Sequence, residues 1–193
     1  MTASEPKSAL LLVDLQNEYL EPQGKFAGDF PTAAQPMLAA TRRLVAWARE
    51  RQMPVIWVRV AYRQPGSLDA GPRAMARANG ALAEGTWGAE IAAGLGRVDS
   101  DPVITKKRGS AFFGTDLNFV LRGLGVERLI VGGISTNWAV ESTVRDGHSY
   151  DYEIVVVREA TATPFEGLQE ASLRSMATVF AQVKSLAEVL GEE

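Results

Sequence analysis

The chain has 193 residues, of which 46% are hydrophobic, and it carries a net charge of −3 with acidic and basic residues interspersed. This composition predicts one domain, residues 1–193, with enough apolar side chains to bury a core. It offers no basic surface for nucleic acid and no polybasic segment for a membrane, so small-molecule or protein partners are favoured.

The sequence has no cysteine, and its longest apolar runs, such as ALLLV and LIVGGI, are too short to cross a bilayer. The polar beginning, MTASEPKS, lacks the apolar core of a signal peptide. We therefore predict a cytoplasmic protein without disulfides, thiolate metal sites or a cysteine nucleophile.

Short apolar runs alternate with amphipathic stretches along the chain. We predict strands at residues 9–14, 55–60, 102–105, 128–133, 154–157 and 178–181, most of which are continuously apolar. The helical stretches are 32–52, 86–95, 116–124, 137–150 and 164–175. This β-α-β alternation predicts a parallel sheet with helices on both faces and right-handed crossovers.

One long connection interrupts this alternation. Residues 61–85 are rich in Gly, Pro, Arg and Ala and have two interpretations, a lid or oligomer contact and a merely solvated loop.

Ligands of parallel sheets bind beyond the carboxyl ends of the strands, so the residues that stand there matter most. Asp14 ends the first strand, in VDLQNEY. Its carboxylate is either a local hydrogen-bonding group or an acid or base tuned by partial burial. Lys106 and Lys107 end the third strand, in ITKKRGSAFFGTDL. A lysine and an aspartate in one crevice stabilise each other's charge, and such a pair can transfer protons.

The fourth strand leads into a helix through GGISTNWAVESTVRDG, residues 132–147. The free amides at the start of a helix can bind an anion or an oxyanion. Thr136 and Asn137 are typical of helix caps, whereas Trp138 fits either a pocket wall or the core.

Three motifs occur in order: VDLQN, ITKKRGSAFFGTDL, and VGGISTNWAVESTVRDG followed by YEIVVVREATAT. Together they resemble the isochorismatase-like hydrolases, also called the cysteine hydrolase superfamily, over about residues 9–190. The resemblance implies a three-layer α/β/α sandwich around a six-stranded, mostly parallel sheet. It also implies a hydrolase that forms homo-oligomers.

The family's usual catalytic set is an aspartate, a lysine and a cysteine. By resemblance Asp14 matches the aspartate, and Lys106, rather than Lys107, matches the lysine. The cysteine belongs in the pattern STNxCVEST, where this sequence has Ala139. The chain therefore departs from its family at the position of the nucleophile.

Other parts of the family's site are implied as well. A cis peptide bond is expected between Ile134 and Ser135, with the amides of Ser135 and Ala139 as oxyanion donors. The substrate is a small molecule, and Arg63 or Arg108 could pair with a carboxylate on it. Candidate pocket linings are Trp57, Tyr62, Arg63, Trp87, Phe112 and Trp138.

Nicotinamidase-type relatives hold a divalent ion with an aspartate and histidines. Here the only histidine is His148, late in the helix after the fourth strand, and the segment after the second strand reads VRVAYRQ. We predict no catalytic metal and no cofactor.

Three hypotheses account for Ala139. In the first, the alanine replaces a cysteine that would attack an amide, carbamoyl or ureido carbon, with Asp14 moving the protons and Lys106 holding the charges. In the second, a natural hydrolase uses Asp14 and Lys106 without a thiol, as isochorismatases do when they protonate a vinyl ether. In the third, the chain is a non-catalytic binding or structural subunit.

Overall fold

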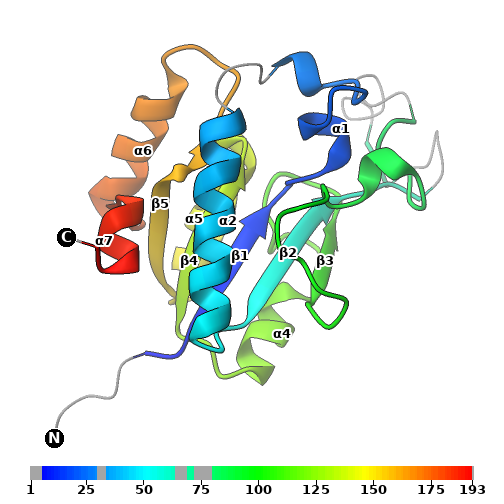
Figure 1. Ribbon diagram of the computed structural model, residues 1–193. Helices are drawn as coiled ribbons and strands as arrows, with labels where there is room; N and C mark the ends of the chain where they lie inside the picture. Colours follow the sequence, from blue (N-terminus) through cyan, green and yellow to red (C-terminus); the bar gives the residue numbers. More distant parts are fainter. Residues whose placement is uncertain (1–5, 30–33, 64–68, 72–79, 193) are drawn as a thin grey trace, which may run out of the picture.

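In the computed structural model, residues 6–29, 34–63, 69–71 and 80–192 are described. A sheet of six strands lies at the centre, in the order β3-β2-β1-β4-β5-β6, and every neighbouring pair is parallel (Figure 1). The predicted parallel sheet is therefore confirmed. The strands are β1 (Ser8–Val13), β2 (Val55–Val60), β3 (Val103–Lys106), β4 (Arg128–Ile134), β5 (Glu153–Ala162) and β6 (Gln182–Lys184).

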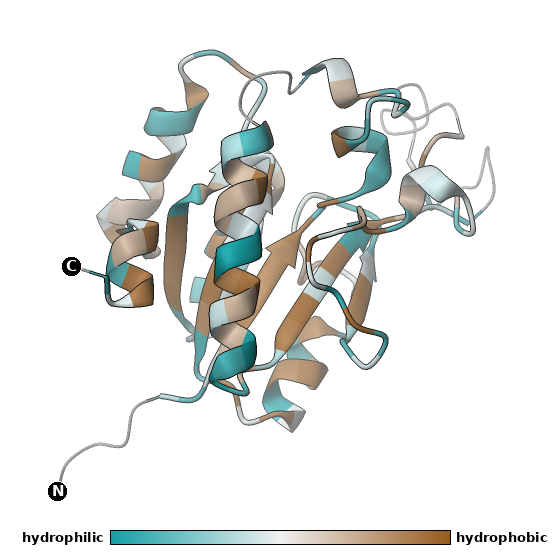
Figure 2. Ribbon diagram, viewed as in Figure 1, coloured by the Kyte–Doolittle hydropathy of each residue, from teal (hydrophilic) through white to brown (hydrophobic). Residues whose placement is uncertain are grey.

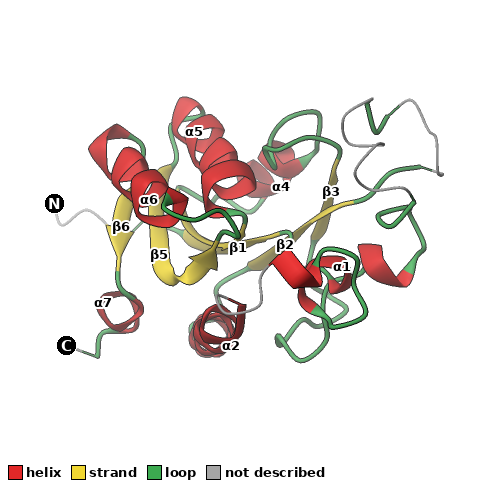
Figure 3. Ribbon diagram, turned by 90° about the horizontal axis from the view of Figure 1, so that it is seen from above, coloured by secondary structure: helices red, strands yellow, loops and turns green. Residues whose placement is uncertain are grey.

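Helices cover both faces of this sheet, as Figure 3 shows. One face carries α1 (Asn17–Leu20), α2 (Ala34–Glu50) and α7 (Leu186–Leu190), and the other carries α4 (Leu117–Gly123), α5 (Glu141–Ser149) and α6 (Leu168–Val179). The described residues also form three short helical turns: η1 (Ala27–Asp29), η2 (Trp87–Ala89) and the π-helical η3 (Thr136–Val140).

The central strands β1, β2 and β4 are almost completely buried because each face of the sheet packs against a helical layer (Figure 2). Successive residues of β1 point to opposite sides, so Leu10 and Leu12 join the core beneath α2 while Leu11 and Val13 join the core beneath α4, α5 and α6. All four side chains are fully buried.

The sheet has a switch point at β1, because β2 and β3 lie on one side of it and β4 to β6 lie on the other. The connection after β1 leads to α2 on one face of the sheet, and the connection after β4 leads to α5 on the other. In open parallel sheets, ligands bind at such a switch point, in the crevice outside the carboxyl ends of the strands. Asp14 follows β1 and Ser135 follows β4, so both residues stand at this crevice.

The prediction of the sixth strand is wrong. Residues 178 and 179 belong to α6, and β6 runs from Gln182 to Lys184. Met176 is fully buried one turn after Leu173, so packing of the helix extends it beyond its predicted end at residue 175. The helix also begins later than predicted, at Leu168, after Gly167 with its positive φ of 73°.

The predicted helix at residues 86–95 is also wrong, because only η2 is helical there. Gly94 has a positive φ of 73°, which a right-handed helix does not accommodate. In addition, the side chains of Gln16 and Asn17 donate to the carbonyls of Ala89 and Trp87, so these carbonyls are bound by groups from outside the segment.

Candidate functional site

Asp14 and Lys106 meet at the crevice. The Lys106 Nζ lies 2.8 Å from the Asp14 Oδ2, and both side chains are almost completely buried. Lys106 ends β3, so its side chain extends past the end of β2 to reach the residue that follows β1. Its ammonium group also donates to the carbonyl of Arg108 at 2.9 Å, which fixes its direction.

The carboxylate of Asp14 is only partly satisfied. Its Oδ1 is buried and has no hydrogen-bond partner among the described residues. Burial raises the pKa of Asp14 above its usual 3.8, while the charge and the hydrogen bond of Lys106 act in the opposite direction. A carboxyl group in this setting can hold a proton and release it to a ligand at Oδ1.

The turn after β4 places Ala139 in the core beneath α4, α5 and α6. The peptide bond between Ile134 and Ser135 is cis, at the position expected from the resemblance. The chain then enters the π-helical η3, in which Ala139 is 5% exposed. Amides in the first turn of a helix lack an acceptor within the helix, so this turn is suited to bind a developing negative charge.

Thr143 fixes the position of Ala139, a role that the sequence analysis did not assign. Its hydroxyl donates to the carbonyl of Ala139 at 2.7 Å and accepts from the amide of Ala111 at 2.9 Å. The loop that follows β3 is thereby joined to η3, which carries Ala139. The only signal in the sequence is a threonine four residues after Ala139, which permits a bond to that carbonyl.

Gln16 is a second positioning residue that was missed. It is fully buried, and its amide makes three hydrogen bonds of 2.8 to 2.9 Å, to the carbonyl and the amide of Val60 and to the carbonyl of Ala89. These bonds hold the end of β2 and the η2 segment against the residues that follow Asp14. A glutamine three residues after an apolar strand does not by itself identify these partners.

Trp138 is 52% exposed and packs against the loop after β3. A Cβ atom added at Gly109 would lie 2.9 Å from the Trp138 Nε1 and 3.4 Å from the Ser142 Oγ. Gly109 therefore permits the indole to approach the backbone next to Arg108, whose carbonyl binds Lys106.

Lys107, the alternative lysine, points elsewhere. Its Nζ lies 2.7 Å from the Glu84 Oε1 and 3.4 Å from the Asp69 Oδ2, and it also donates to the carbonyl of Ala61. Lys107 therefore joins the described parts of the connection 61–85 to the end of β3. The predicted lid or oligomer contact lies largely outside the described residues.

Tyr62 lies near the Asp14–Lys106 ion pair, whereas Arg63 pairs with Asp69. Burial raises the pKa of the Tyr62 hydroxyl, and the negative charge of Asp14 is the second cause of this shift. The side chain of Arg63 is 77% exposed and lies 3.9 Å from Asp69. Arg108 donates to the carbonyl of Asp69 at 2.7 Å, so it is anchored beside the same segment.

The remaining candidate linings are distributed over the molecule. Trp57 is fully buried beneath α2, where its indole donates to Asp101 at 2.9 Å, so it has no surface for a ligand. Phe112 is 6% exposed and stacks against Tyr152, with ring centroids 5.9 Å apart. Trp87 is half exposed in η2.

Among the described residues, no three histidine, cysteine, aspartate or glutamate side chains are grouped so that they could hold a metal ion. The ring of His148 packs edge-on against Phe180, with centroids 5.5 Å apart. In the same part of the chain, none of the helices combines the length and the apolar composition needed to span a bilayer.

The chain is similar to known proteins over nearly its whole length. The family model for the isochorismatase domain matches residues 8–188 of the sequence. The structure is similar to an isochorismatase family protein from Desulfovibrio vulgaris subsp. vulgaris str. Hildenborough, at 30% identity and a TM-score of 0.85, covering 95% of this chain and 96% of that one.

Two further solved structures are similar over nearly the whole chain. A cysteine hydrolase from Pseudomonas syringae pv. phaseolicola 1448A has 29% identity and a TM-score of 0.86, covering 96% of this chain and 91% of that one. An N-carbamoylsarcosine amidase from Thermoplasma acidophilum has 26% identity and a TM-score of 0.78, covering 93% and 96%.

Proposed function

The chain belongs to the isochorismatase family of hydrolases, and from this premise we propose that its site is built to hydrolyse a small amide, carbamoyl or ureido C–N bond. The observation that carries the proposal is the buried Asp14–Lys106 pair, because Asp14 follows β1 and the turn that bears Ala139 follows the neighbouring strand β4. The similarity to an N-carbamoylsarcosine amidase supports this class of bond.

In this proposal, Ala139 occupies the position of the nucleophile. A thiolate there would attack the carbonyl carbon, and the amides of Ser135 and residue 139 would bind the oxyanion. Asp14 would take the thiol proton and give it to the departing amine, which leaves an acyl group on sulfur. Water, deprotonated by Asp14, would then displace the sulfur, and the thiol would regain the proton.

Lys106 supplies the positive charge of the site. It pairs with Asp14 while the carboxyl group is ionised, and it remains anchored to the Arg108 carbonyl when Asp14 is protonated. Around this pair, Tyr62, Trp87 and Trp138 are our candidates for contacts with the body of the substrate, and Arg108 is a candidate for pairing with a carboxylate on it.

Introducing a cysteine at position 139 tests the proposal directly. We expect Ala139→Cys to raise the hydrolysis of the best substrate in a panel of small amides, carbamoyl and ureido compounds at least about 100-fold over the unchanged protein. Asp14→Asn in the same background should abolish the gain. Ser142→Cys, which adds a thiol three residues further along the helix, is the matched control and should give none.

A second candidate reaction is favoured by the raised pKa of Asp14, because a protonated carboxyl group is a general acid. Asp14 would protonate the carbon–carbon double bond of a vinyl ether, water would add to the resulting cation, and the adduct would break into a carbonyl compound and an alcohol. Here the unchanged protein is active, Asp14→Asn is inactive, and Ala139→Cys brings no gain. A chain that is inactive in every form, with and without the thiol, would instead support a non-catalytic subunit.

A further inference from the structure

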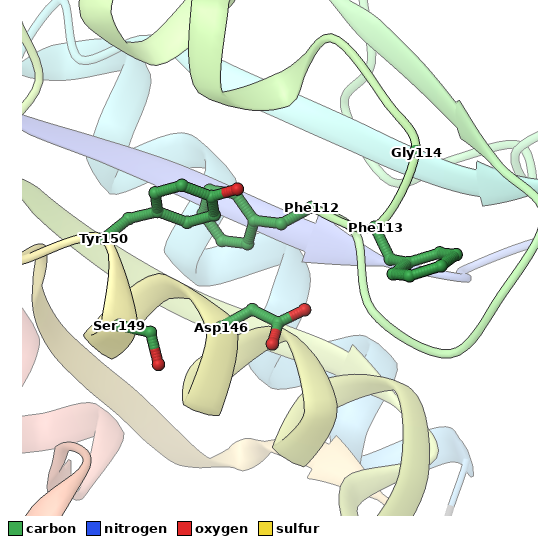
Figure 4. Close-up of a pocket in the computed structure, with 6 residues that line it drawn as sticks. All are labelled: Phe112, Phe113, Gly114, Asp146, Ser149 and Tyr150. Carbon is green, nitrogen blue, oxygen red and sulfur yellow. The ribbon is translucent and has the colours of Figure 1, made fainter.

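We propose that a second cavity, away from the Asp14–Lys106 pair, binds a small organic cation of the quaternary ammonium class. The cavity has a volume of about 340 Å³ and lies between the loop after β3 and the C-terminal end of α5 (Figure 4). Its size is within the range of small-molecule sites. The residues that line it are Phe112, Phe113, Gly114, Asp146, Ser149 and Tyr150.

This cavity is separate from the proposed catalytic site. Ala139 precedes the first residue of α5, whereas Asp146, Ser149 and Tyr150 lie at the other end of this nine-residue helix. A helix of this length extends over about 13 Å, which is longer than a small cation such as choline.

The cavity carries an unpaired negative charge. In Figure 4 the carboxylate of Asp146 lies below the rings of Phe112 and Tyr150 and is turned toward the side where Phe113 lies. Within the described parts of the chain, no side chain forms an ion pair or hydrogen bond with Asp146. Its neighbour Arg145 is bound by Glu141 at 2.6 Å, on a different side of the helix.

The end of α5 adds to this negative potential. The helix macrodipole places partial negative charge at the C-terminus, where a cation is stabilised. The hydroxyl of Ser149 already donates to the carbonyl of Arg145 at 2.9 Å, so it is not free to donate to an anion in the cavity. Both features favour a positively charged ligand.

Aromatic rings supply the remaining contacts. Phe113 is 64% exposed and Tyr150 is 44% exposed, while Phe112 is buried with its ring centroid 5.3 Å from that of Tyr150. Ring faces attract cations, and most strongly those that hold water weakly. One carboxylate among aromatic rings suits a trimethylammonium group better than a metal ion, which requires several oxygen ligands.

Choline is the probe for the experiment. Titration of the unchanged protein, followed by nuclear magnetic resonance, should shift the amide signals of Phe113 and Tyr150 with saturation. The uncharged alcohol in which a tert-butyl group replaces the trimethylammonium group should bind at least about tenfold more weakly, because it keeps the shape and loses the charge.

Two substitutions separate the contributions to binding. Asp146→Asn should weaken choline binding at least about fivefold, whereas Asp99→Asn, which removes the same charge from a fully exposed position, should leave it unchanged. Phe113→Leu keeps an apolar side chain on an exposed position, so the fold is retained, and it should also weaken binding.

Three results would overturn the proposal. The first is that choline and the uncharged alcohol bind with equal affinity. The second is that Asp146→Asn and Asp99→Asn weaken choline binding equally. The third is that Phe113→Leu does not change the affinity for choline. A fourth contrary result would come from sedimentation velocity. If the unchanged protein is a dimer and Asp146→Asn dissociates it, a second copy of the chain occupies the cavity instead of a cation.

Discussion

At the scale of single residues, Asp14 combines three properties that are rarely found together. It is buried, its Oδ1 has no partner among the described residues, and its backbone has a positive φ of 57°. Left-handed conformations are uncommon for residues other than glycine, and they cluster at functional sites. This combination is what distinguishes Asp14 from a carboxylate that merely caps a loop.

The raised pKa of Asp14 predicts how the stability of the protein depends on pH. The folded state holds the proton more tightly than the unfolded chain, in which the carboxyl group titrates near 3.8. Its stabilising contribution is therefore complete below about pH 3.8 and is lost as the pH rises through the higher pKa of the folded state. Asp14→Asn remains uncharged throughout and lacks this loss.

Urea unfolding of both proteins at a series of pH values measures the effect. As the pH rises above about 4, the free energy of unfolding of the Asn variant should increase relative to that of the unchanged protein. This difference should change by at most about 1.4 kcal/mol per pH unit. A gap that moves in the opposite direction would mean that Lys106 outweighs burial and lowers the pKa of Asp14.

At the scale of elements, the contact between β1 and β4 determines where the site forms. Gly133 has a φ of 126°, and a Cβ atom there would lie 2.1 Å from the carbonyl oxygen of Val13. Only glycine lets the end of β4 approach the backbone immediately before Asp14.

We therefore expect Gly133→Ala to destabilise the fold by about 3 kcal/mol or more. Gly123→Ala is the matched control, because this residue ends α4 and its added Cβ would meet no atom within 4 Å. That change should be neutral or stabilising by up to about 1 kcal/mol. Thermal and urea unfolding compare the two, and similar values for both variants would contradict the role given to Gly133.

Most of the strands could be predicted from the sequence. Five of the six strands were predicted near their observed positions, because a strand buried on both faces is marked by a continuous apolar run. The sixth was misplaced because β6, at the edge of the sheet, is only three residues long and partly exposed, so its sequence carries little signal. The helix predicted at residues 86–95 is wrong for a different reason, because backbone carbonyls of this segment accept hydrogen bonds from Gln16 and Asn17 in a distant part of the chain.

For the site, the strand ends predicted that an aspartate and a lysine would meet. The choice of Lys106 over Lys107 rested on the resemblance, since two adjacent lysines do not reveal which one points toward Asp14. The contacts made by Gln16 and Thr143 join segments far apart in the sequence and could be recognised only in the folded chain. A homo-oligomer and a cytoplasmic location stay predictions.

At the scale of the whole molecule, the site exists only when three strands are in register. Asp14 follows β1, Lys106 ends β3, and Ala139 follows β4. The distances among these residues therefore depend on the correct pairing of the strands in the folded sheet. Our central claim is that these three positions share one space and form a hydrolase site whose nucleophile is absent. The claim can be tested without knowing the substrate.

The chain has no cysteine, so Ala139→Cys introduces a single thiol whose titration can be followed by the ultraviolet absorbance of the thiolate. If the three positions share one space, removing the carboxylate charge with Asp14→Asn leaves Lys106 acting alone on the thiol, and the thiol pKa falls. Asp99→Asn, remote and exposed, should not change it. A thiol pKa that is the same with Asp14 and with Asn at that position would contradict the account.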